Sequence, residues 1–247
     1  EITDQTLYTC HGAFYNPGNM VLTVIGDVDP ERVLSIAGEL VTGKATGNPR
    51  RDYGGAEPEQ AVSHDSRRTM AVAAPLFQLG FKIAPPAKEE LLKTRLVAEL
   101  AGDLLLGDSS ALYARLYNGG LITKNFSYGF EDYPGCAFFA LGGESEAPEK
   151  VRELFFAAAK EMGEKGFREE DFRRLNKAAY GDMVSRLNSF EHTAIELAQG
   201  HLDGVDVLSF PEAFRSITVR EVRDFIARWF TPDQAALAVI TPGGEES

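Results

Sequence analysis

The feature that most constrains this chain is a near-repeat of one short segment at its two ends. Residues 14–31 read FYNPGNMVLTVIGDVDPE and residues 229–246 read WFTPDQAALAVITPGGEE, and a shift of 215 positions aligns them without a gap. The same shift pairs Thr3 with Thr218. Because internal repeats indicate repeated structural units, both segments are predicted to form a Thr-capped helix that ends in two aromatic residues, then a turn with proline and a buried strand.

The repeat also predicts how the chain is divided into domains. In the second copy this unit ends a domain that begins near Arg67, so the first copy is expected to end a domain too, with about 140 of its residues lying upstream. We therefore predict the C-terminal tail of a first domain at residues 1–42, a linker at 43–66, and a complete second domain at 67–247. Chance similarity is the alternative, because helix–turn–strand units are common and the identities are few.

The first 42 residues and the following linker have distinct patterns. Helices are predicted at residues 3–15 and from Asp29 onward, with residues 20–25 as a strand, and the second helix is expected to be buried through Val33, Ile36 and Leu40. Residues 42–66 are polar, interrupted by glycine and proline, and lack an apolar period, which is typical of a linker.

The remaining chain mixes strands and helices. In residues 77–83 large apolar side chains alternate with Gln78, Gly80 and Lys82, which predicts a strand of a sheet with one buried face. Further strands are predicted at 70–74, 126–130 and 136–141, the last two as a hairpin, and helices at 88–106, 109–118, 148–163, 169–187 and 189–202. This order predicts an α+β fold in which helices cover one face of an antiparallel or mixed sheet.

Composition excludes some functions and suggests a compartment. A formal net charge of −12 disfavours a nucleic-acid partner, and no run of 18 apolar residues is available to span a membrane. Cys10 and Cys136 lie in apolar patterns, so they are predicted to be buried free thiols in a reducing, cytoplasmic compartment. No signal peptide is visible, and a chain that starts at Glu1 is expected to be a fragment.

Three segments resemble the insulinase/pitrilysin-like zinc metallopeptidases, the inverzincins. YNPGNMVLTVIGDVDPE at 15–31 is similar to the end of that family's first domain, GDSSALYARLYNGGLI at 107–122 to a segment of its second, and RLNSFEHTAIELAQGHLDG at 186–204 to its bacterial YmfH-like branch. The resemblance implies two homologous α+β domains of the LuxS/MPP-like metallohydrolase fold, which in many members border a peptide-holding chamber. It also implies that the zinc motif H-x-x-E-H of active members lies in the first domain.

That zinc motif is absent from this chain. None of its histidines opens an H-x-x-E-H, so we predict no catalytic residue, no metal ligand and no cofactor here, with zinc expected in the full-length parent; the histidines are His11, His64, His192 and His201. His192 and Glu196 share a face of a predicted helix, but a zinc site needs three converging ligands. A histidine at the surface or the edge of the core is the favoured interpretation.

The resemblance also suggests residues that bind substrate. Active members of the family commonly hold substrate with an Arg–Tyr pair from the second domain. Here Tyr117 stands where the arginine is usual, Arg115 lies two residues earlier, and Thr123 replaces the tyrosine. Arg115 and Tyr117 are therefore candidate substrate-binding residues. The alternative is that Tyr117 packs on Tyr113, four residues away on the same helix.

The leading hypothesis is that the chain is the C-terminal, non-zinc-binding part of a bacterial zinc-dependent endopeptidase. It would bind peptide substrate and close the chamber, with the missing N-terminal domain or a homologous subunit as its partner, and would cleave nothing alone. An exposed edge of its sheet could accept an extended peptide as an added strand. Two alternatives remain: a non-catalytic scaffold or subunit of the same family, and an unrelated α+β binding domain.

Overall fold

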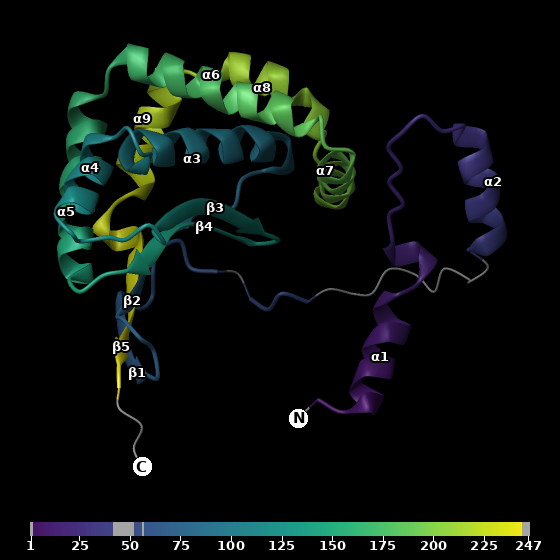
Figure 1. Ribbon diagram of the computed structural model, residues 1–247, viewed down its shortest axis with the longest axis horizontal. Helices are drawn as coiled ribbons and strands as arrows, with labels where there is room; N and C mark the ends of the chain where they lie inside the picture. Colours follow the sequence, from purple (N-terminus) through teal and green to yellow (C-terminus); the bar gives the residue numbers. More distant parts are fainter. Residues whose placement is uncertain (1, 42–51, 56, 244–247) are drawn as a thin grey trace. The chain divides into compact units, whose positions relative to one another are not determined.

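A computed structural model describes residues 2–41, 52–55 and 57–243 of the chain (Figure 1). Two compact units can be distinguished: Glu1–Gly54 together with Asp182–Leu208, and Gly55–Gly181 together with Ser209–Ser247. Part of the predicted linker, residues 42–51 and 56, lies outside the described residues. None of the helices in the described ranges is both long and apolar enough to cross a membrane.

The second unit is built on a mixed sheet with the strand order β1-β5-β2-β4-β3. Strand β5 runs parallel to β1, whereas β2 is antiparallel to both β5 and β4, and β3 is antiparallel to β4. The strands are β1 Asp65–Met70, β2 Leu76–Ile83, β3 Ser127–Tyr133, β4 Cys136–Glu144 and β5 Ala235–Pro242. The sheet and its helices confirm the predicted α+β fold.

Helices gather on one side of this sheet (Figure 1). Helices α3 and α9 contact the strands β3 and β2, and α5 packs against α9. The helical segments from the start of the second unit onward are η2 Lys88–Glu90, α3 Leu91–Leu106, α4 Ala111–Asn118, α5 Pro148–Lys165, α6 Glu169–Arg186, α7 Phe190–Asp203, η3 Val207–Ser209, α8 Phe210–Ser216, α9 Val219–Trp229 and η4 Pro232–Gln234. The layer of helices leaves the opposite side of the sheet as the surface on which a site can form.

Four phenylalanines form the centre of the core between the sheet and the helices. The ring of Phe81 on β2 lies 5.0 Å from Phe155 on α5 and 5.2 Å from Phe230 after α9, between ring centroids, and Phe139 on β4 lies 4.9 Å from Phe230. All four are at most 4% exposed. Burying one such side chain contributes roughly 1.5–3 kcal/mol, so this cluster fixes the sheet against the helices.

Local sequence signals set many of the element boundaries. The Ser110 hydroxyl accepts a hydrogen bond from the Tyr113 amide and begins α4, and the Ser189 hydroxyl begins α7 in the same way. The β3–β4 hairpin turns through Pro134 and Gly135, whose φ of +82° lies in the left-handed region that favours glycine. These boundaries agree with the predicted helices and hairpin.

Two predictions within the second unit were wrong or incomplete. A strand was predicted at residues 70–74, but β1 ends at Met70 and begins at Asp65, inside the predicted linker. All six residues of β1 are exposed, so they lack the apolar alternation that marks a strand in the sequence. Cys136 was predicted to be buried and is only partly so, because it opens β4 at the end of the hairpin.

The first unit contains α1 Asp4–Phe14, η1 Pro17–Asn19, α2 Pro30–Leu40 and α7. Residues 20–25, predicted as a strand, are assigned to no strand, because no neighbouring strand pairs with them in the described part of the chain. The apolar residues of α2 were predicted to be buried, but Ile36 and Leu40 are exposed and Val33 is only half-buried. Cys10 on α1 is exposed as well. The helices form from local signals, yet their apolar faces lack a covering layer in this unit.

Candidate functional site

One face of the sheet is open across the part of the chain that the structure describes. Along β2, Phe77, Leu79 and Phe81 point into the core, and the residues between them point the other way. The open face carries mainly small or polar side chains, among them Gln78, Gly80, Ser127, Gly129, Ala140, Gly142, Ala236 and Ala238. A Cβ atom added at Gly80 or Gly129 would meet no atom within 4 Å. The backbone of this face is therefore little covered by side chains, so another polypeptide chain can approach it closely.

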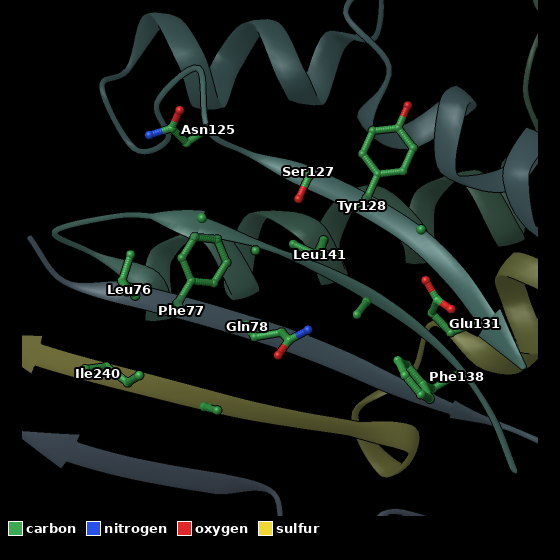
Figure 2. Close-up of a pocket in the computed structure, with 15 residues that line it drawn as sticks. Leu76, Phe77, Gln78, Asn125, Ser127, Tyr128, Glu131, Phe138, Leu141 and Ile240 are labelled. Carbon is green, nitrogen blue, oxygen red and sulfur yellow. The ribbon is translucent and has the colours of Figure 1, made fainter. Parts of the chain in front are cut away.

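A groove of about 560 Å³ lies on this face and is formed by β2, β3, β4 and β5 (Figure 2). Asn125 and Leu76 lie toward one end of the groove, and Glu131 and Phe138 lie toward the other (Figure 2). A second hollow of about 530 Å³ continues toward β1 and shares Gln78 with the first. The open face is thus hollowed from one edge of the sheet to the other.

Strand β3 is an edge strand of the sheet. It pairs with β4 on one side, and no strand of the described ranges pairs with its other side. An edge strand presents unpaired backbone N–H and C=O groups to its surroundings. Ser127, Gly129 and Glu131 on β3 also line the groove, so the free edge and the groove are continuous.

Polar contacts hold β3 to helix α3. Arg95 of α3 donates from Nε to Asp132 Oδ1 at 2.6 Å and from Nη2 to Oδ2 at 2.9 Å. The Tyr128 hydroxyl donates to Asp103 Oδ1 at 2.6 Å. Such a bidentate Arg–carboxylate pair has a defined geometry, so these two contacts fix the position of the edge strand.

A cavity of about 420 Å³ lies beside these contacts, between α3 and β3. It is lined by Glu99 and Asp103 of α3 and by Tyr128 and Phe130 of β3, among others. Burial raises the pKa of Asp103 above its ordinary value, although the hydrogen bond from Tyr128 opposes this. Burial, together with the carboxylate of Asp103, raises the pKa of Tyr128. The hydroxyl therefore stays protonated and remains the donor at neutral pH.

The candidate substrate-binding residues Arg115 and Tyr117 lie on α4 and do not line the groove. Both are exposed. The Tyr117 ring stacks on Tyr113 with centroids 5.8 Å apart, as the packing alternative predicts. Tyr113 lies 6.4 Å from Phe126, and Phe126 lies 6.5 Å from Tyr128 on β3, between ring centroids. A run of aromatic rings thus connects α4 with the start of the edge strand, and a substrate role for Arg115 and Tyr117 stays a prediction.

Polar side chains border the same end of the groove. Glu144 at the end of β4 accepts hydrogen bonds from Thr123 Oγ1 and Asn125 Nδ2, both at 3.3 Å. The neighbouring Gly143 has a φ of +152°, and a Cβ atom there would lie 3.0 Å from Phe126 Cα. The backbone at Gly143 and the backbone at Phe126 lie so close together that position 143 requires glycine. Thr123, the residue at the family's tyrosine position, serves here to order the loop before β3.

The residues present do not fit a zinc site. No group of three His, Cys, Asp or Glu side chains in the described ranges is placed to hold a metal ion. His192 Nε2 lies 3.3 Å from Glu196 Oε1 as a pair on α7, and His64 Nδ1 lies 2.9 Å from the Ala235 carbonyl oxygen. No hydrolytic step is therefore assigned to these residues.

The groove was not predicted from the sequence, although the small residues that form it are visible there. Small residues occur at consecutive alternate positions in two strands, Ala140 and Gly142 in β4 and Ala236 and Ala238 in β5, and at Gly80 in β2. In each strand taken alone, the small residues indicate only that one face of the strand packs weakly. Only the strand order shows that these positions meet on one face.

The mixed sheet with helices on one side and an open opposite face defines this class of protein as an α+β domain. The family described as Peptidase M16 inactive domain matches residues 1–178. The chain therefore belongs to the M16 peptidase family as its inactive domain, which confirms the resemblance of the three segments.

Individual relatives support this assignment. The chain is 29% identical over 245 residues to a Bacillus subtilis protein named "Uncharacterized zinc protease YmfH". The alignment covers 98% of this chain and 57% of the Bacillus subtilis protein. The structure of an M16-like peptidase from Alicyclobacillus acidocaldarius matches 98% of this chain and 59% of its own, with a TM-score of 0.85 at 20% identity. A protease from Helicobacter pylori gives 0.78 at 17% identity, with the same two coverages. The chain thus spans less than two thirds of the length of these proteins.

Proposed function

We propose that this chain is the non-catalytic C-terminal part of a bacterial, cytoplasmic zinc-dependent endopeptidase, and that its open sheet face holds an extended peptide substrate. In this proposal residues 1–42 end a first domain, residues 43–66 link the domains, and residues 67–247 form the second. Zinc and the hydrolytic residues belong to the part of the longer protein outside this chain. The name of the Bacillus subtilis relative supports the zinc dependence of the longer protein.

The observation that carries the proposal is the continuity of the free β3 edge with the groove. An extended peptide binds to a sheet edge through main-chain hydrogen bonds, and its alternate side chains then point to opposite faces. Beside β3, one set of these side chains would lie over the groove of about 560 Å³, and the other would lie near the cavity between α3 and β3. Main-chain hydrogen bonds at the edge of β3 would thus give affinity, and the groove and the cavity between α3 and β3 would select the side chains of the peptide.

The charge of the cavity between α3 and β3 and of the groove suggests which peptides bind. Glu99 and Asp103 line this cavity on the helix side of β3 together with Arg95, which is paired with Asp132, and Glu131 lies in the groove on the open side. The whole chain also carries a formal net charge of −12. Opposite charges raise the rate of encounter and suppress wrong partners, so peptides with lysine or arginine are the favoured substrates.

Chamber closure follows from the same surface. A sheet face of small side chains gives a peptide space only if a second wall covers it, and the longer relatives contain additional chain that can supply this wall. The chain would then hold and enclose the peptide while the other domain cleaves it.

Strand addition is tested best with modified peptides rather than modified protein. A fluorescent basic peptide and two versions methylated on alternate backbone nitrogens, in opposite registers, are titrated into the chain and followed by anisotropy. Only one register should lose affinity, by roughly tenfold or more, because strand addition uses every second N–H group. The proposal would be contradicted if the two methylated peptides bind equally well, or if none of the three peptides binds.

The roles of Arg115 and Tyr117 are tested in the longer protein. Arg115→Ala and Tyr117→Ala should raise KM for a peptide about tenfold with little change in stability, because both side chains are exposed. Arg220→Ala is a matched control, since Arg220 is also exposed and pairs with Asp224 nearby on α9. Should the longer protein show no peptidase activity that a chelator removes, the scaffold function of the alternative hypothesis would replace this one.

A further inference from the structure

Strand β1 forms the edge of the sheet opposite to β3. It pairs in parallel with β5, and within residues 2–41, 52–55 and 57–243 no strand pairs with its other side. All six of its residues are exposed. Charged side chains protect a free edge against unspecific pairing, and they also decide which partner strand the edge can accept.

Backbone hydrogen bonds show which groups of β1 are directed toward its free edge. The Leu237 amide donates to the His64 carbonyl oxygen at 2.7 Å, and the Gly243 amide donates to the Met70 carbonyl oxygen at 3.0 Å. Because successive residues of a strand direct their backbone groups to opposite sides, the even-numbered residues of β1 face β5. The odd-numbered residues therefore direct their N–H and C=O groups to the free edge: Asp65, Arg67 and Thr69.

Two of these three positions carry opposite charges. Asp65 Oδ1 accepts a hydrogen bond from Arg152 Nη1 of α5 at 2.5 Å, and Arg67 pairs with Glu149 at the start of the same helix. Both β1 side chains thus lie on the helix side of the sheet, and they remain 63% and 56% exposed. Ser66 between them lines the hollow on the open face. Each charge is therefore held by α5 and still accessible to another chain.

We propose that β1 pairs antiparallel with β1 of a second copy of this chain, with Asp65 of each copy opposite Arg67 of the other. Residues directly opposite each other in an antiparallel pair have side chains on the same face, where opposite charges are favourable. The two-fold symmetry of a closed dimer gives this pair twice. Each pair would join the two ion pairs with α5 into a network of four charges of alternating sign, which contributes more than isolated exposed pairs do.

The same charges disfavour the neighbouring registers. Only shifts by two residues keep every side chain on its own face of the sheet. Such a shift in one direction places Asp65 opposite Asp65 of the second copy, and in the other direction it places Arg67 opposite Arg67. Like charges directly opposite each other are destabilising. The edge is therefore complementary to itself in the stated register, which identifies a second copy as its occupant.

The dimer would leave the groove and the β3 edge free. Strand β3 is at the other end of the sheet from β1. A two-fold axis perpendicular to the sheet would place the open faces of both copies on the same side of one continuous sheet. Dimer formation and peptide binding therefore involve different edges and can be tested separately.

Analytical ultracentrifugation of this chain over a hundredfold range of concentration tests the dimer. The unchanged chain should dimerise reversibly. Asp65→Arg and Arg67→Asp each turn both opposite pairs into like pairs, so each should raise the Kd of the dimer by roughly tenfold or more. An equimolar mixture of the two variants should recover the dimer, because the new arginine of one variant then lies opposite the new aspartate of the other. A chain that is monomeric throughout, or a mixture that stays monomeric, would overturn the proposal.

A matched control separates the edge from net charge. Arg220→Asp makes the same change in net charge as Arg67→Asp at an exposed position on α9 and should leave the Kd nearly unchanged. The urea transition of Trp229 verifies that all variants are folded. A dimer that neither Asp65→Arg nor Arg67→Asp weakens would use another surface, which contradicts the assignment to β1.

Amide exchange measured residue by residue with NMR tests the strand pairing itself. The amides of Asp65 and Arg67 should exchange roughly tenfold or more slowly as the concentration rises, because the dimer pairs them. The amides of Ser66 and Arg68 face β5 in each copy and should exchange equally at all concentrations. Exchange that is independent of concentration at all four amides would rule out a shared β1 ladder.

An added peptide is the competing occupant of the β1 edge. The fluorescent basic peptide should bind the Arg67→Asp variant as well as it binds the unchanged chain, since its proposed site is the edge of β3. A tenfold or larger loss of peptide affinity in this variant would assign β1 to the peptide and overturn the assignment to a second copy.

Discussion

Residues 3–25 and residues 218–240 form the same helix and turn, yet only the second segment is buried. Threonine caps, helix length and the turn after the helix agree between the two. Burial and strand pairing differ between the two segments. Strand β5 pairs with a strand on each side, whereas residues 20–25 pair with no strand in the described part of the chain. The comparison separates what a segment encodes by itself from what its surroundings contribute.

The largest expected difference concerns a buried charge. Val222→Asp should lower the free energy of unfolding of the second unit by about 4 kcal/mol or more, because Val222 is fully buried in α9. Leu7→Asp, at the matching position of α1, should change it by less than about 0.5 kcal/mol in this chain. Urea unfolding followed by the fluorescence of Trp229, the one tryptophan, measures both. Similar losses in the two variants would mean that α1 is buried and that the comparison fails.

The threonine caps should give a smaller difference. Thr218→Ala removes an acceptor for the Glu221 amide and should cost about 1 kcal/mol in the same urea experiment. Thr3→Ala removes the matching acceptor for the Thr6 amide but should leave the Trp229 transition unchanged, while exchange of the first α1 amides becomes faster. Replacement by serine restores the cap and is the control for each. A shift of the Trp229 transition in Thr3→Ala would contradict the independence of α1.

The smallest expected difference depends on pH. Burial raises the pKa of Glu221, but hydrogen bonds from Lys93 and Thr218 outweigh it, so the pKa lies below its ordinary value of 4.5. The stabilisation from this carboxylate is therefore complete above about pH 4.5 and is lost as the pH falls through the lowered pKa. At the matching position α1 has Thr6, which does not titrate.

A comparison of the chain with its Glu221→Gln variant isolates this effect. The difference in urea midpoint between the two should shrink as the pH is lowered from 6 toward 3, because other carboxylates titrate equally in both proteins. A difference that stays constant with pH would show that the pair of Glu221 with Lys93, 2.5 Å apart, does not stabilise the fold. Arg220→Ala changes a more exposed pair on the same helix and should change the urea midpoint by less than Glu221→Gln does at pH 6.

The sequence was sufficient where the signal is local. The helices predicted at 109–118 and 189–202 agree with α4 and α7, which Ser110 and Ser189 cap, and the alternation around Phe81 predicted the buried face of β2. Strand β1 was misplaced because it is an exposed edge strand and the strand that pairs with it in the described ranges, β5, follows it by well over a hundred residues. Helix α8 was not predicted because its seven residues are too few to show a helical period of apolar side chains.

The candidate site was less accessible to sequence reasoning than the fold. Arg115 and Tyr117 came from the family resemblance, and the structure shows them on α4, away from the lining of the groove. The groove itself depends on which strands are neighbours, and strand order is a non-local property. Small residues such as Gly80 and Ala238 acquire meaning only when β2 and β5 are known to lie side by side.

The interior position of β5, between β1 and β2, has a consequence for how the protein is made. Among the strands of the described sheet, β1 is synthesised first and β5 last, yet β5 is the strand that pairs with β1. Until then β2 also lacks one neighbour, and apolar strands remain open to wrong partners during synthesis. The sheet therefore cannot grow from its first strand to its last as the chain emerges, and a polypeptide that ends before Ala235 lacks the strand that joins β1 to the other three strands.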